Sequence, residues 1–135
     1  MKVLRLARET WDVLAVMDHR DKCPVLDYLA ELEAPYRAAK KGMLTLLREV
    51  IPRDGPPRGQ PLCKPLGYGL FELRKQPKGQ KLRVVWFYGE GRSIVCTTAF
   101  SKAETTPRTE IDRSRWLLKR FAEENRRGEI EIVER

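Results

Sequence analysis

The sequence has little of what metal centres, disulfide scaffolds and membrane proteins need. It contains one histidine, His19, and three widely spaced cysteines, Cys23, Cys63 and Cys96, with no CxxC pair. This set offers no credible zinc site and no disulfide framework, so we expect no metal, no other cofactor and reduced thiols. No apolar run approaches the roughly 18 residues of a membrane span, and no signal-peptide pattern opens the chain. These absences predict a soluble cytoplasmic protein with no membrane partner.

What the sequence does have is a globular composition with a localised basic excess. Its 135 residues are 41% hydrophobic and 34% charged, which predicts one folded domain over residues 1–135. Residues 53–92 carry +6 of the net charge of +8, because nine basic residues face only Asp54, Glu72 and Glu90. An excess gathered in one stretch favours a polyanion binder. The alternative is a solvated charged edge that keeps strands from aggregating.

Three runs rich in Val, Ile, aromatic residues and Thr predict a three-stranded antiparallel meander over 69–75, 81–88 and 92–100. The middle run is apolar on both faces, which is typical of a central strand covered on each side. Arg83 lies within this run. A charge there is costly unless it meets a partner or opens onto a cleft, so Arg83 stands out from the other bases.

Helical patterns flank the meander. Pro24 opens a first helix, and a second begins near Pro35 and runs to Ile51 with apolar residues at i, i+3, i+4 and i+7. Thr106 as N-cap with Pro107 at the first position predicts the last helix. Its expected buried residues are Ile111, Ser114, Leu118, Phe121 and Ala122.

The remaining segments are assigned less directly. Residues 11–17 form the predicted first strand, and a helix is an alternative for residues 3–8 because their propensities favour it. Residues 52–65 contain five of the nine prolines and are predicted as a loop. Residues 129–135 alternate like a strand, so they either extend a sheet edge or hang free.

Taken in order, these segments resemble the RelE/HigB-like type II toxin superfamily, in its phage-derived, HigB-like branch. The resemblance extends from about residue 11 to residue 121, which would be the core of the domain, with 129–135 as a C-terminal tail. Its motifs are Pro24–Leu29, Gly69–Arg74, Leu82–Trp86, Ile94–Lys102 and Thr105–Ile111.

The resemblance implies an α+β, RelE-like fold, with an N-terminal strand and a helix pair packed on an antiparallel sheet and a C-terminal helix. It also implies a toxin that cleaves mRNA on the ribosome, needs no metal and is neutralised by a cognate antitoxin protein. In that reaction the ribose 2′-OH attacks the neighbouring phosphate and leaves a cyclic phosphate. The chemistry requires a cation against the developing charge, a proton acceptor and a proton donor.

Arg74 and Arg83 match the arginines of these motifs and are the candidates for transition-state stabilisation, because an arginine stays charged and can hold a phosphate bidentately. Lys102 matches a lysine that follows the third strand, and is the third catalytic candidate. With no histidine in or after the sheet, the general base would be Lys102, Tyr88 or a carboxylate. The candidates for RNA contacts are Lys64, Lys75, Lys81 and Arg92.

The sequence departs from the family pattern at two places. Ala103 and Thr105 stand where members often have basic residues. These departures favour a second hypothesis, a non-catalytic basic RNA-binding or phage accessory protein that keeps the toxin fold. The retained Arg74, Arg83 and Lys102 favour the endoribonuclease.

Overall fold

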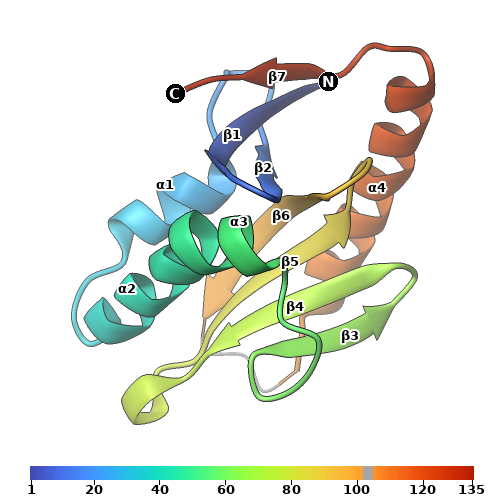
Figure 1. Ribbon diagram of the computed structural model, residues 1–135. Coiled ribbons are helices and arrows are strands. Elements are labelled where there is room, and N and C mark those ends of the chain that lie inside the picture. The colour runs from blue at the N-terminus through green and yellow to red at the C-terminus, as the bar shows by residue number, and fades with distance from the viewer. Residues whose placement is uncertain (102–104) are drawn as a thin grey trace.

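The computed structural model describes residues 1–101 and 105–135 and shows one mixed sheet with helices on both faces (Figure 1). The strands are β1 (Lys2–Arg8), β2 (Asp12–Val16), β3 (Cys63–Gly67), β4 (Leu70–Lys75), β5 (Leu82–Tyr88), β6 (Ser93–Ser101) and β7 (Glu131–Val133). The helical segments are α1 (Pro24–Glu31), α2 (Arg37–Thr45), the π-helical turn η1 (Leu46–Val50), α3 (Ile51–Asp54), the 3₁₀ turn η2 (Pro77–Gly79) and α4 (Arg108–Arg126). The predicted α+β class is confirmed. Within these two ranges, no helix combines the length and the apolar character that crossing a bilayer requires.

The strand order is β3-β4-β5-β6-β2-β1-β7, and only the β2–β6 and β1–β7 pairs are parallel. The three strands predicted for the meander are confirmed to within one residue. The predicted first strand is the second strand of an N-terminal hairpin. Residues 3–8, for which a helix was an alternative, form β1, because pairing with β2 and β7 outweighs a weak helical propensity.

The proline-rich stretch 52–65 is not only a loop, and that prediction was wrong at both ends. After η1, the helical run continues through Pro52 to Asp54. The wider turn of η1 comes just before Pro52, which has no N–H to donate to a helical hydrogen bond. Cys63 begins β3, which makes the meander four-stranded. Pro65 is tolerated there because β3 is an edge strand and its outer side needs no ladder hydrogen bonds.

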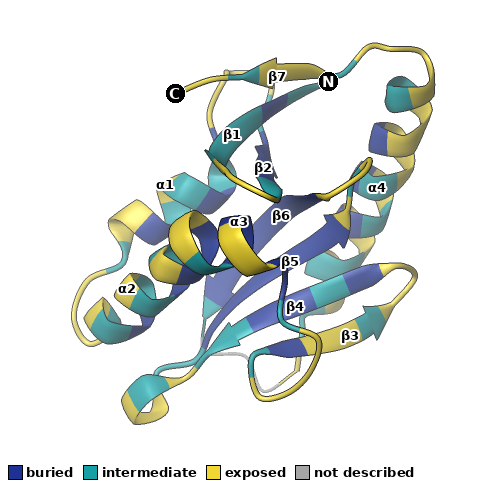
Figure 2. Cartoon of the chain, viewed as in Figure 1, coloured by how far each residue is buried: buried dark blue, intermediate teal, exposed yellow. Residues whose placement is uncertain are grey.

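Two hydrophobic cores lie on opposite faces of the sheet. One joins α1, α2, η1 and α3 to the sheet, with Met43, Leu73 and Trp86 fully buried within it. The other joins α4 to the sheet through Phe87 and Phe121. Figure 2 shows β5 and β6 buried along their length while the outer sides of the helices are exposed. The prediction that the middle strand is covered on both faces is therefore confirmed.

The start of α4 differs from the prediction. Pro107 is the N-cap, and the hydroxyl of Thr106 donates to Glu72 rather than to the helix. The buried residues of α4 are Ser114, Leu117 and Phe121, whereas Ala122 is exposed. The tail does extend a sheet edge, since β7 pairs in parallel with β1.

Candidate functional site

Arg74 of β4 and Arg83 of β5 are direct register partners in the sheet. Side chains of opposed residues in an antiparallel pair lie on the same face. Glu72, two residues before Arg74, shares that face. Each arginine has its Nε 3.4 Å from the same Glu72 Oε1. The two cations therefore converge, and they share one carboxylate.

Arg83 is the inner member of this cluster and is only 2% exposed. Its Nη1 donates to the carbonyl oxygen of Leu82 at 3.0 Å, and its Nη2 donates to Oε1 of Gln76. Burial lowers the pKa of the Arg83 guanidinium, and the positive charge of Arg74 adds to that shift. Glu72 offsets the cost of this charge, so Arg83 meets a partner and does not open onto a cleft.

Arg74 is the outer member, with 20% of its side chain exposed. Its Nε is buried and makes no hydrogen bond within the described part of the chain. A buried donor without an acceptor is costly. A guanidinium also presents its donors in the fork that fits phosphate oxygens. Arg74 is thus the more accessible guanidinium of the pair.

Hydroxyl groups connect the cluster to the start of α4. Thr106, just before the helix, donates to Oε2 of Glu72, and Thr98 of β6 donates to Oε2 of Glu110 in the first helical turn. The polar cluster therefore lies on the α4 side of the sheet, where the chain passes from β6 into α4. Lys102, the third catalytic candidate, lies outside the described residues.

The structure brings one of the predicted RNA contacts to the arginine pair and separates two others from it. Lys64 is exposed and is the register partner of Glu72, so it lies on the same face. Lys75 lies on the opposite face. Its side chain passes over Gly42 of α2, where an added Cβ would be 3.3 Å from Lys75 Cδ. Arg92 is exposed in the turn after β5, at the far end of that strand from Arg83.

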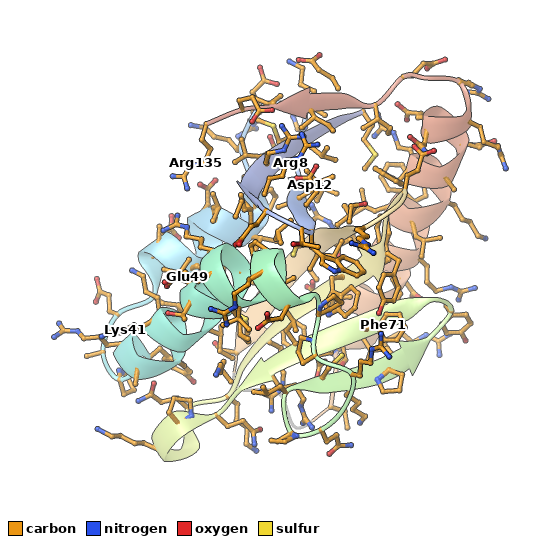
Figure 3. All side chains as sticks on the ribbon, viewed as in Figure 1. Arg8, Asp12, Lys41, Glu49, Phe71 and Arg135 are labelled. Atoms are coloured by element: carbon orange, nitrogen blue, oxygen red, sulfur yellow. The ribbon has the colours of Figure 1, made fainter. Side chains whose placement is uncertain are left out.

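Lys81 and Tyr88 were also candidates. Lys81 is half-buried and stands just before β5, two residues from Arg83. Tyr88 lies on the opposite face, where its ring centroid is 5.5 Å from Phe71 and 5.0 Å from Trp86. Figure 3 shows Phe71 on β4, on the side that carries α3. Tyr88 is therefore not beside Arg83, and its proposed role as general base is withdrawn.

Sequence reasoning missed part of the cluster. It counted Glu72 among the acids of the basic stretch, gave no role to Gln76 and did not foresee the bond from Thr106 to Glu72. The signal for Glu72 was present, since an acid two residues from a strand arginine shares its face. Among the described residues, no group of three or more His, Cys, Asp or Glu could hold a metal ion.

The structure defines an α+β protein with one mixed sheet, helices on both faces of that sheet and an arginine pair around one buried acid. The family model described as "Phage derived protein Gp49-like (DUF891)" matches residues 27–119, and the chain belongs to this family. The family is part of the RelE/HigB-like toxin superfamily. No curated protein matches the chain significantly.

Proposed function

We propose that the protein is the toxin of a type II toxin–antitoxin system and acts as a metal-independent endoribonuclease that cleaves mRNA on the ribosome. The observation that carries the proposal is the convergence of Arg74 and Arg83 on one shared carboxylate, with Lys64 exposed on the same face. Membership of a family within a toxin superfamily supports the toxin role. The proposed partners are mRNA, the ribosome and a cognate antitoxin.

The proposed reaction is an intramolecular phosphoryl transfer within the RNA strand. The ribose 2′-oxygen loses its proton and attacks the adjacent phosphorus, the bond from phosphorus to O5′ breaks, and O5′ takes a proton. Arg74 would contact the phosphate, because its side chain is the more exposed of the pair. Removing a donor of this kind from a transition state typically lowers the rate by roughly 100- to 1000-fold.

Arg83 has a different role in this proposal. Its guanidinium is buried and its donors are directed at Glu72, Gln76 and the Leu82 carbonyl. It would therefore position Glu72 and add to the local positive potential without touching the substrate. Among the described residues, Glu72 is the carboxylate that pairs with both arginines, and it joins Lys102 as a candidate acceptor for the 2′-OH proton. Its use would require Thr106 to release its hydrogen bond.

A second candidate function is a non-catalytic RNA-binding or phage accessory protein. The observation that favours it is that the hydrogen-bond donors of Arg83 are used within the protein. Its contacts with Glu72 on β4 and with Gln76 after that strand are those of a structural cross-link. The replacement of family basic residues by Ala103 and Thr105 points the same way. In this case Arg74 would bind phosphate and the RNA strand would stay intact.

A growth assay separates the two functions. The chain is expressed in bacteria with and without the neighbouring reading frame, alongside Arg74→Ala and the exposed control Arg20→Ala. The toxin proposal predicts growth arrest by the wild type and by Arg20→Ala, relief by the neighbour, and loss of arrest in Arg74→Ala. Normal growth with soluble protein and intact, salt-sensitive RNA binding would support the non-catalytic function instead.

A further inference from the structure

The turn between β3 and β4 holds an exposed aromatic side chain in an unfavourable backbone conformation. Tyr68 has φ +57° and lies between Gly67 at +85° and Gly69 at +79°. A bulky residue with positive φ is uncommon, and such outliers gather at functional sites. Tyr68 is also 62% exposed, so burial of its ring does not offset the cost. A glycine or asparagine would make this turn more easily, so the turn conformation does not account for the tyrosine.

The ring of Tyr68 is held in place from one side only. The guanidinium carbon of Arg115, on α4, lies 3.7 Å from its centroid. This cation–π contact fixes the ring orientation. The turn itself rests on α4, since a Cβ at Gly69 would lie 3.5 Å from Leu118 Cδ1. With Arg115 over one face and 62% of the residue exposed, the other face of the ring is open to solvent.

The charges around this ring favour a polyanion. Arg115 and the exposed Lys119 lie on α4, and Lys64 is exposed on β3 in the same hairpin. Arg74 is four residues beyond Leu70 along β4, which is roughly 13 Å on extended backbone, and Tyr68 lies in the turn just before that strand. Lys64, the register partner of Glu72, lies between them on the α4 side. The ring, the lysine and the outer arginine therefore follow one edge of the sheet.

We propose that Tyr68, backed by Arg115, is a base-stacking site for single-stranded RNA, placed along the strand from the phosphate held at Arg74. The inference rests on the proposed function for the identity of its ligand. Every nucleobase has a π-face, so stacking is tolerant of sequence. The site holds and orients the RNA strand without recognising its base sequence.

The test compares Tyr68→Leu and Tyr68→Phe with the wild type by titration calorimetry at fixed low salt. Both replacements keep a side chain that is unbranched at Cβ in the same strained turn, and only Phe keeps a π-face. The control is Tyr88→Leu, which removes an exposed tyrosine from the opposite face. The two probes are a single-stranded RNA of about 12 nucleotides and inorganic polyphosphate of similar charge.

Stacking predicts that Tyr68→Leu weakens RNA binding by roughly five- to 100-fold, while Tyr68→Phe and Tyr88→Leu stay within about twofold. Polyphosphate, which has no bases, should bind all variants alike. Unchanged RNA binding by Tyr68→Leu, or an equal loss of affinity for RNA and for polyphosphate, would overturn the proposed stacking site.

The same titrations separate this inference from the proposed function. Cleavage by the wild type together with unchanged RNA binding by Tyr68→Leu would overturn the stacking site alone. Weakened RNA binding by Tyr68→Leu in a protein that never cleaves would leave the site standing and reject the nuclease. Absence of RNA binding by the wild type would overturn the stacking site, while cleavage in the presence of ribosomes would still support the nuclease.

Discussion

Glu72 receives contacts from Arg74, Arg83 and Thr106 while only 3% of it is exposed. Both arginines lie within ion-pair distance of this one carboxylate. A buried charge that loses its counter-ion costs far more than the pair contributes, because desolvation is no longer offset. The stability of this part of the sheet therefore depends on Glu72.

We predict that Glu72→Gln lowers the free energy of unfolding by about 3–5 kcal/mol, because it leaves the buried Arg83 without a counter-charge. Urea denaturation followed by circular dichroism measures the change. The control is Glu90→Gln, an exposed acid expected to stay within about 0.5 kcal/mol of the wild type. Pairing Glu72→Gln with Arg83→Met should recover part of the loss. A Glu72→Gln protein as stable as the wild type would show that the cluster is solvated, not buried.

The three cysteines give a second prediction. All are free and buried, and burial raises the pKa of the Cys96, Cys23 and Cys63 thiols. Since the thiolate is the reactive form, the native protein should react with a thiol reagent at pH 8 far more slowly than the urea-unfolded protein. The raised pKa also means that stability falls as the pH rises above the ordinary thiol value of 9.0. Rapid labelling of Cys96 in the folded state would contradict the packing of β6.

The packing of α4 on β6 centres on a small residue. Ser114 is fully buried, and its Oγ lies 2.7 Å from Thr97 Oγ1, which also bonds the Val85 carbonyl at 3.1 Å. Nothing larger fits at this contact without moving the helix away from the sheet. Thr106 lies just before α4 and Arg115 lies on it, so the position of this helix on the sheet affects both proposed sites.

We expect Ser114→Ala to cost only about 0.5–1.5 kcal/mol, since Thr97 keeps its bond to Val85. Ser114→Leu should cost about 1–3 kcal/mol or more through overpacking. Ala122→Leu, on the exposed side of the same helix, is the matched control and should change stability by less than about 0.5 kcal/mol. Thermal unfolding of the three variants checks this. Equal effects of the two leucines would mean that α4 does not pack through Ser114.

At the level of elements, the sequence was most informative where a pattern was strong and local. Strands β4 to β6 and helix α1 were predicted nearly to the residue, because alternation, turn residues and Pro24 all agree there. Strand β1 and strand β3 were not, because each is fixed by a neighbouring strand that no local pattern reveals. Thr106 was assigned to the wrong partner, since a hydroxyl before Pro107 can serve a helix or a distant acid equally well.

At the level of the whole molecule, the basic stretch 53–92 is not one patch. The sheet sends Lys75 to the α2 face and Lys64 to the α4 face, and Arg92 lies at the far end of β5. Counting charge along the chain identified the strands that carry the basic residues, but it could not predict the face of the sheet on which each residue lies. The sequence placed Arg74 and Arg83 on adjacent strands, and their convergence follows from the register of β4 and β5. The sequence also predicted a strand covered on both faces around Arg83, but it did not identify Glu72 and Gln76 as the partners of the Arg83 guanidinium.

The central claim is that Arg74, beside the buried Arg83 and Glu72, holds a scissile phosphate. The most direct measurement maps the ends of a defined mRNA after incubation with the purified protein, with and without ribosomes. We predict fragments that end in a cyclic phosphate and a 5′-OH, formed roughly 100- to 1000-fold more slowly by folded Arg74→Ala and at the wild-type rate by Arg20→Ala. Intact mRNA under all conditions, or equal cleavage by Arg74→Ala, would contradict the account.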